Sequence, residues 1–213
     1  MASTSPPAAI DPLLGRLRAG DETAFRELVQ RHHGPMTRLA LSIVGVPAAA
    51  DEVVQDTWAA ALEGLGAFEG RASVKTWLFR ICVNRARTRR ERDQRSTPFS
   101  ALESEEGDGP AVDPSRFAAD GHWKLSPADQ SFDTSPESEA LRTELREHLA
   151  QAVAALPERF RVVLTLRDLD GFSGEEVCNV MQITESNQRV LLHRARSRVR
   201  ALLEPYLAGR SQP

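Results

Sequence analysis

Two groups of basic residues have the composition needed to bind the phosphates of a nucleic acid. Between Arg71 and Arg95 nine basic residues stand against two acidic ones, and between Arg189 and Arg200 there are five arginines and no acidic residue. From Thr97 to Ala140 the balance reverses to ten acidic residues against two basic ones. The net charge of -3 therefore conceals two separate electrostatic footprints of the kind that phosphate backbones attract.

The first basic group is interleaved with aromatic residues, a composition that suits an opened nucleic-acid strand. Cations can follow the phosphates while exposed aromatic rings and a glycine-rich loop receive an unstacked base. Trp77 lies on the apolar stripe of its helix, which favours a core tryptophan over a base platform. Asn84 lies between the packed and the basic halves of that helix, where a base-reading amide would be held rigidly. The group comprises Phe68, Arg71, Lys75, Trp77, Phe79, Arg80, Asn84, Arg85 and Arg87.

The second basic group lies in a pattern typical of a helix-turn-helix. A short helix, a turn at Gln182–Thr184 and a longer basic helix follow one another, and in that motif the second helix enters the major groove. The alternative is an amphipathic helix with a merely solvated basic face, but such a helix usually mixes charges of both signs. One side of this helix would face the domain, and its residues are Gln188, Leu192, Ala195, Val199 and Leu202. That leaves Ser186, Asn187, Arg189, His193, Arg194 and Arg196 for bases and phosphates.

No residue pattern predicts a catalytic centre, a metal site or a cofactor. The five histidines are scattered without metal-ligand spacing, and no glycine-rich phosphate loop precedes a helix. Cys82 and Cys178 each lie in an apolar helical pattern, so we interpret both as reduced core residues. No apolar run approaches the roughly 18 residues of a membrane span, and no signal peptide is recognisable, so a cytoplasmic protein is expected.

The elements that position these groups are all expected to be helices. Asp21 caps a helix that reaches Ile43 with a kink or break at Gly34–Pro35, and a second helix covers about residues 50–65. Ser73 caps the third helix, and Ser135–Pro136 begins a helix in the second half. Helices then begin at Pro157, at a capping box formed by Ser173 and Glu176, and at Thr184.

We therefore predict an all-α protein with two small helical domains joined by an acidic flexible linker. Residues 1–10 form a disordered lead, 11–96 the first domain, 97–134 the linker, 135–206 the helix-turn-helix domain and 207–213 a tail. The linker has too little apolar surface to offset the entropy of ordering. Its isolated aromatics include Phe117, Trp123 and Phe132, which either insert into a partner or anchor locally.

Three stretches, taken in order, resemble the extracytoplasmic-function (ECF) sigma factors of RNA polymerase. They are DEVVQDTW at 51–58, TWLFRICVNRA at 76–86 and LHRAR at 192–196. Each motif alone is weak, but the ordered set is specific. The resemblance covers about residues 20–95 and 137–203 and leaves only the ends and the linker uncovered.

This resemblance implies an alternative sigma factor that binds core RNA polymerase and promoter DNA and is not itself an enzyme. Its first domain, a region 2-like bundle, would dock on the β′ clamp, and its second, region 4-like domain would bind DNA near minus thirty-five and meet the β flap. An anti-sigma factor would commonly hold it inactive. Residues implied in clamp binding are Asp51, Glu52, Gln55, Asp56 and Trp58. Residues implied in recognising and melting the minus-ten element are Phe68, Arg71, Ser73, Lys75, Arg80, Asn84, Arg85 and Arg87.

Two departures from the family pattern lie in the helix-turn-helix. Gln182 stands where family turns usually have glycine, and a non-glycine residue in a left-handed conformation costs roughly 1 kcal/mol, so a looser or differently shaped turn is expected. The recognition helix begins ESNQRVL at 185–191 instead of the more frequent Thr-Val-Lys type of segment.

Two other classes of protein compete with the sigma factor. A helix-turn-helix repressor or activator would use residues 20–95 to sense a ligand or to dimerise, but a sensor would not need the basic third helix. A helical-bundle enzyme would need clustered carboxylates or histidines on facing helices, and the sequence shows none.

Overall fold

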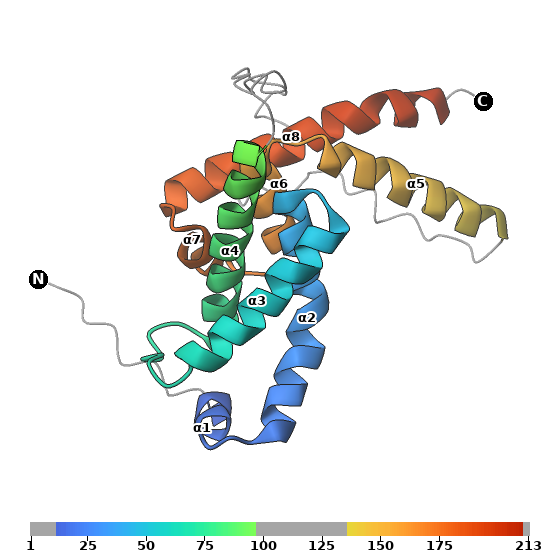
Figure 1. Ribbon diagram of the computed structural model, residues 1–213. Coiled ribbons are helices and arrows are strands. Elements are labelled where there is room, and N and C mark those ends of the chain that lie inside the picture. The colour runs from blue at the N-terminus through green and yellow to red at the C-terminus, as the bar shows by residue number, and fades with distance from the viewer. Residues whose placement is uncertain (1–11, 97–135, 211–213) are drawn as a thin grey trace, which may run out of the picture. The chain divides into compact units, whose positions relative to one another are not determined.

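The computed structural model describes residues 12–96 and 136–210, and within these ranges every regular element is a helix. The helices are α1 (Pro12–Arg18), α2 (Glu22–Val44), α3 (Pro47–Gly64), α4 (Val74–Ser96), α5 (Pro136–Ala154), α6 (Glu158–Leu164), the π-helical turn η4 (Thr165–Leu169), α7 (Gly174–Met181) and α8 (Glu185–Arg210) (Figure 1). The predicted all-α fold is confirmed. The lead at 1–10 and the linker at 97–134 lie outside the described residues.

The chain forms two compact units. The first contains α1 to α4 together with η4 and α7, and the second contains α5, α6 and α8. The sequence instead divides the chain at the linker, into 11–96 and 135–206, and these boundaries remain a prediction of how the chain is organised.

The first unit is built on α2, α3 and α4, which pack against one another in pairs (Figure 1). Met36, Leu39, Val54, Leu78 and Phe79 are fully buried between them. Apolar residues at spacings of three and four place such a stripe on one face of each helix, and burying each large side chain contributes about 1.5 to 3 kcal/mol.

Local capping sets where these helices begin and end. The Asp21 carboxylate accepts hydrogen bonds from the amides of Thr23 (2.9 Å) and Ala24 (3.0 Å), and Gly45 ends α2 with a φ of 77°. The Ser73 hydroxyl accepts from the amide of Thr76 at 3.1 Å at the start of α4. The caps at Asp21 and Ser73 were expected from sequence and are confirmed.

Of the kink or break expected at Gly34–Pro35, the break is absent, because α2 continues through Pro35 to Val44. Buried residues lie on both sides of the proline, including His32, Met36 and Leu39. Packing of these side chains against neighbouring helices holds the backbone helical where local propensity alone would interrupt it.

Cys82 is a buried thiol in the centre of the first unit. Its side chain has no exposed surface, its Sγ lies 3.7 Å from the carbonyl oxygen of Met36, and burial raises its pKa to about 12. Both Cys82 and Cys178 are free cysteines, and Cys178 is half-buried. The interpretation as a core residue agrees with the position of Cys82, whereas Cys178 is only half-buried and lies outside the core.

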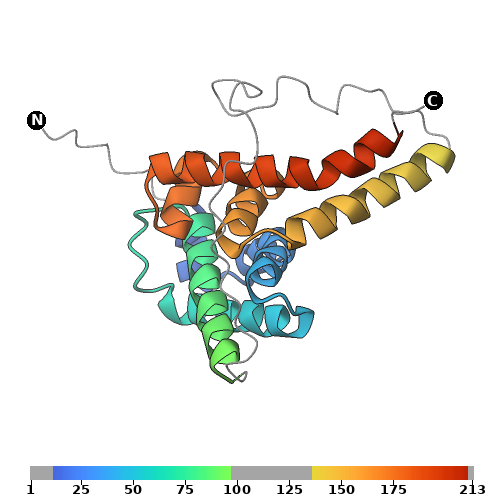
Figure 2. The same ribbon diagram turned by 90° about the horizontal axis from the view of Figure 1, so that it is seen from above.

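The second unit packs α8 against α6 and α5, and Figure 2 shows α5 and α8 side by side. Gln188, Leu192, Ala195 and Val199 face the unit as expected, each at most 8% exposed. Leu202 was expected on the same face, but it is 49% exposed, so this expectation is wrong. No side chain of residues 200–206 is buried on any side of α8, so Leu202 lies beyond the part of the helix that is buried against the unit. No helix in the described part of the chain is both long and apolar enough to cross a membrane.

Candidate nucleic-acid interface

The loop at residues 65–73, here the α3–α4 loop, is fixed by an aromatic stack. The Phe68 ring lies 4.6 Å from the ring of Trp77 with an interplanar angle of 23°. Phe68 is only 9% exposed, and Trp77 is half-buried. The structure therefore places Phe68 in a supporting position, where its ring packs on Trp77 and holds the loop beside the first turns of α4.

Four of the expected DNA-contacting residues share one face of the third long helix. Ser73, Arg80, Asn84 and Arg87 follow one another at steps of seven, four and three residues, and such steps return to the same side of an α-helix. The first three are exposed and Arg87 is half-buried. We call this row the α4 strip. Arg85 is exposed beside it, and Arg71 is exposed in the loop, where it pairs with Glu69.

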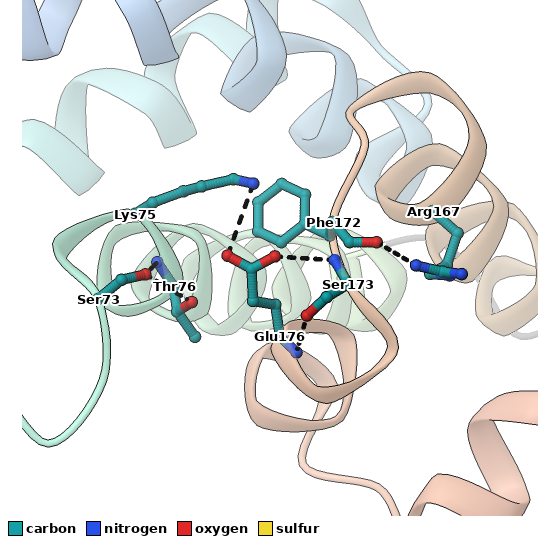
Figure 3. Close-up of polar contacts among 7 residues, drawn as sticks. All are labelled: Ser73, Lys75, Thr76, Arg167, Phe172, Ser173 and Glu176. Carbon is teal, nitrogen blue, oxygen red and sulfur yellow. Dashed lines mark hydrogen bonds and ion pairs between the residues drawn. The ribbon is translucent and has the colours of Figure 1, made fainter. Parts of the chain in front are cut away.

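Lys75 lies on the opposite side of α4. It is on the side of Phe79, Cys82 and Ala86, all three of which have no exposed surface. Its Nζ is 3.7 Å from Oε1 of Glu176 and 3.6 Å from the centre of the Phe172 ring (Figure 3). The structure does not bring Lys75 together with the α4 strip.

The partners of Lys75 are themselves held in place. Oε2 of Glu176 accepts a hydrogen bond from the Ser173 amide at 2.8 Å, and the Ser173 hydroxyl accepts from the Glu176 amide at 3.1 Å, which is the capping box expected from sequence (Figure 3). The Phe172 ring lies 4.7 Å from the Phe79 ring, and its carbonyl accepts from Arg167. A phosphate that approached Lys75 would have to displace a carboxylate that is already ordered.

A further ion pair joins the same segment to α2. Nη2 of Arg38 lies 2.6 Å from Oδ1 of Asp170, whose side chain is 1% exposed. The other carboxylate oxygen, Oδ2, has no hydrogen-bond partner. Burial raises the pKa of Asp170, and the Arg38 guanidinium opposes that shift.

The residues expected to bind the polymerase clamp all lie on the solvent side of α3. Asp51, Glu52, Gln55 and Asp56 are exposed, whereas Val53, Val54 and Thr57 on the other side are buried. Trp58 is half-buried, with its ring edge on Phe25 at 5.8 Å and its Nε1 donating to Nδ1 of His33 at 3.4 Å. The structure brings the five residues together as one acidic face with an aromatic edge.

Arg89 is a residue that the sequence interpretation missed. Its guanidinium pairs with Glu52 on α3 and with both carboxylate oxygens of Asp93, at 3.1 and 3.0 Å. The pairs raise the pKa of Arg89, through the hydrogen bond to Glu52 first. The sequence pattern indicates only the pair with Asp93, which lies four residues after Arg89. The pair with Glu52, which is 37 positions away, has no local sequence signal.

The expected DNA-contacting residues of α8 lie on the side away from its buried row. Ser186, Asn187, Arg189 and Arg194 are exposed, and His193 and Arg196 are half-buried. Arg189 pairs with Glu185 one turn earlier. The Thr184 hydroxyl accepts from the Asn187 amide at 3.3 Å, as expected for a cap. Gln182 has φ 57° and ψ 49°, and its amide donates to the Cys178 carbonyl, so the turn takes the regular left-handed form without glycine. The expected looser or differently shaped turn is therefore not found.

Val190 is a second residue that the sequence interpretation missed. It is 48% exposed and lies on the solvent side of α8, three residues after Asn187 and four before Arg194. A helical wheel places it among the polar residues, and that placement is the signal that could have found it.

The comparisons with known proteins agree with this arrangement of helices. Residues 28–96 match the family described as Sigma-70 region 2, and residues 146–199 match Sigma-70, region 4. The chain therefore belongs to the sigma-70 family of RNA polymerase sigma factors. Its relatives place it within the ECF group, whose members bind core RNA polymerase and promoter DNA and direct transcription initiation.

Among the relatives, the RNA polymerase sigma-H factor of Pseudomonas aeruginosa is 30% identical over 195 residues, covering 92% of this chain and 94% of that protein. The ECF RNA polymerase sigma-E factor of Escherichia coli is 31% identical over 198 residues, with the same two coverages. The similarity to both relatives therefore extends over most of the chain.

Two solved structures share the fold. CnrH, in complex with the cytosolic domain of CnrY, has a TM-score of 0.59 and 24% identity, covering 91% of this chain and 96% of that one. RpoE of Bartonella quintana, in complex with the anti-sigma factor NepR, has a TM-score of 0.58 and 20% identity, covering 84% and 96%.

Proposed function

We propose that this sigma factor recognises and opens the minus-ten element through the α4 strip and the α3–α4 loop. The observation that carries the proposal is the common face of Ser73, Arg80, Asn84 and Arg87, which presents two cations, an amide and a hydroxyl on one side of a rigid helix. Arginine grips phosphates, and an amide can read a base edge in bidentate fashion. Arg71 and Arg85 extend the basic surface, and Phe68 supports the loop.

The solvent face of α3 is the proposed docking surface for the β′ clamp of core polymerase. Trp58 supplies an aromatic edge of the type enriched at protein interfaces, and Asp51, Glu52, Gln55 and Asp56 supply carboxylates and an amide suited to a polar rim. The Arg89 bridge to Glu52 joins this face to α4. Binding to polymerase would thus orient the helix that carries the α4 strip.

The helix α8 is the proposed minus-thirty-five reader. Ser186, Asn187 and Arg189 lie in its first turns, where base edges are read, and the later Arg194 and Arg196 grip phosphates with His193 beside them. Its domain, residues 135–206, would meet the β flap. The domain at 11–96 would hold the minus-ten and clamp functions, with the acidic linker between the two.

An anti-sigma factor is the proposed regulator. The two solved relatives are named in complexes, one with an anti-sigma factor and one with the cytosolic domain of a partner. We place the protein in the cytoplasm, where polymerase acts, and assign it no catalytic site of its own: the chemistry belongs to the polymerase.

A run-off transcription assay with core polymerase tests the proposal against a repressor or activator. A promoter-dependent transcript that requires this protein is expected from genomic template. Tight duplex binding by the protein alone, with no transcript from any template, would favour the repressor instead.

Permanganate mapping tests the minus-ten residues. Asn84→Ala is expected to reduce the reactivity of thymines in the opened region, whereas Thr88→Ala, one turn further along and with its hydroxyl bonded to the Asn84 carbonyl at 3.0 Å, should not. The Lys75→Ala variant is mapped with permanganate in the same way. Unchanged reactivity in either the Asn84 or the Lys75 variant would remove that residue from the set.

A further inference from the structure

Arg18, at the end of α1, holds the backbone of the α3–α4 loop. Its guanidinium donates to the carbonyl of Phe68 and, at 3.5 Å from Nε, to the carbonyl of Leu65. Leu65 is the C-cap of α3, where carbonyls lack helical partners and a cation is favoured by the helix dipole. One planar side chain with several donors therefore serves both ends of a four-residue segment.

A second contact from the same helix lies under the other half of the loop. Gly70 has a φ of +74°, and a Cβ at this position would lie 3.6 Å from Cδ2 of Leu14. Leu14 and Leu17 are at most 5% exposed, so α1 is anchored in the core. Nε of Arg16 bonds to the Asp21 carboxylate at 2.8 Å, which joins the end of α1 to the start of α2. The helix α1, from which Arg18 reaches the loop, is therefore itself held in place.

Phe68 is consequently held from two sides. Its ring stacks on Trp77, and its carbonyl is bound by Arg18. The rest of the loop contains the conformationally free Gly66 and Gly70, and its contacts include the Arg71–Glu69 ion pair and the approach of Gly70 to Leu14. A loop that captures an unstacked base must hold its shape to within about 0.5 Å, so a brace on its backbone acts on base recognition directly.

We propose that Arg18 is a positioning residue for base recognition at the minus-ten element, acting through the loop backbone without touching DNA. This inference rests on the proposed role of the loop and of the α4 strip. Arg18 lies outside residues 28–96, the segment matched to sigma region 2. It is exposed, so its contacts add little to overall stability, and removal of the brace should change loop geometry more than folding.

The test compares open-complex formation by holoenzyme on a cognate minus-ten element and on single-base variants of it. Arg18→Ala is expected to lower the discrimination between cognate and substituted bases by about tenfold at one or two positions, with unchanged affinity for core polymerase. Arg18→Lys should recover part of it, because one ammonium can serve one of the two carbonyls. Arg26→Ala, an exposed arginine of α2, is the matched control and should retain full discrimination.

Salt dependence separates positioning from direct phosphate contact. If Arg18 touched DNA, its removal would weaken binding uniformly across sequences and lower the salt slope by about one, and that result would overturn the inference. Full discrimination in Arg18→Ala, or reduced discrimination matched by a fall in melting temperature, would overturn it as well. If Asn84→Ala and Arg71→Ala also left opening unchanged, the proposed minus-ten surface itself would have failed, which is a distinguishable outcome.

Discussion

Val190 is an aliphatic side chain on the side of α8 that we propose faces DNA, and we expect it to contact a thymine methyl group. The C5-methyl is the apolar feature of the major groove, and burying one such group contributes about 0.8 kcal/mol, or about fourfold in affinity. Replacing each thymine of the upstream element in turn by uracil should weaken wild-type binding at one position by this factor. Val190→Ala should be insensitive to that replacement.

The control for this prediction is Leu202→Ala. Leu202 is 49% exposed on the same helix but lies off the side that carries Asn187 and Arg194. It should keep the sensitivity of the wild-type protein to uracil. Equal sensitivity of the Val190→Ala variant at every thymine would show that Val190 makes no such contact.

Asp170 should make the stability of the first unit fall as pH rises through the acid range. Its raised pKa, caused first by burial, means that the folded state binds this proton more tightly than the unfolded state does. The loss of folding stability caused by ionised Asp170 is therefore absent below the pKa of the unfolded state, about 3.9, and fully present above the raised pKa of the folded state. The difference in unfolding free energy between wild type and Asp170→Asn, followed by denaturant titration from pH 3 to 7, should move in favour of the variant as pH rises. A constant difference would contradict this assignment.

At the scale of elements, the turn between α7 and α8 contains a measurable strain. Gln182 adopts φ 57°, where a side chain costs roughly 1 kcal/mol and glycine costs nothing. Gln182→Gly should therefore raise the free energy of unfolding by about 0.5 to 1 kcal/mol, as measured by denaturant titration. Gln182→Ala keeps the Cβ and should be close to neutral. A fall in stability of the glycine variant would show that the Gln182 side chain stabilises the turn.

Elements were predicted where their signals are local. The caps at Asp21, Ser73 and Ser173 follow from residue types within one turn of each helix start, and all three are present. The continuity of α2 through Pro35 and the π-helical turn at Thr165–Leu169 were not predicted, because packing from distant residues decides them.

The candidate site divides in the same way. Helical spacing predicts the common face of Arg80, Asn84 and Arg87. The separation of Lys75 from them was within reach of the same spacing, but its partners Phe172 and Glu176 come from about a hundred residues further along the chain. No local sequence pattern identifies contacts between residues so far apart in the chain. The hydrogen bonds from Arg18 to the α3–α4 loop are a further example of such contacts.

At the scale of the whole molecule, we expect both cationic surfaces to contribute to the salt dependence of promoter affinity, and the two contributions can be measured separately. Removing one phosphate-binding side chain should reduce the slope of log affinity against log salt by about one. Arg194→Ala in holoenzyme should do so on templates that carry the upstream element and have no effect on templates that lack it. Arg146→Ala, an exposed arginine of α5, should leave the slope unchanged. An equal reduction on both kinds of template would contradict minus-thirty-five binding by α8.

Because Cys82 is buried, the rate at which its thiol is alkylated reports the rate at which the surrounding helices separate. A thiol with a pKa of about 12 and no exposed surface is nearly all protonated at neutral pH and beyond the reach of an alkylating reagent. It can be labelled only after α2, α3 and α4 come apart, so at high reagent concentration the labelling rate equals the rate at which that bundle opens. Cellular oxidants meet the same barrier at Cys82, so the half-buried Cys178 is the more accessible of the two free thiols.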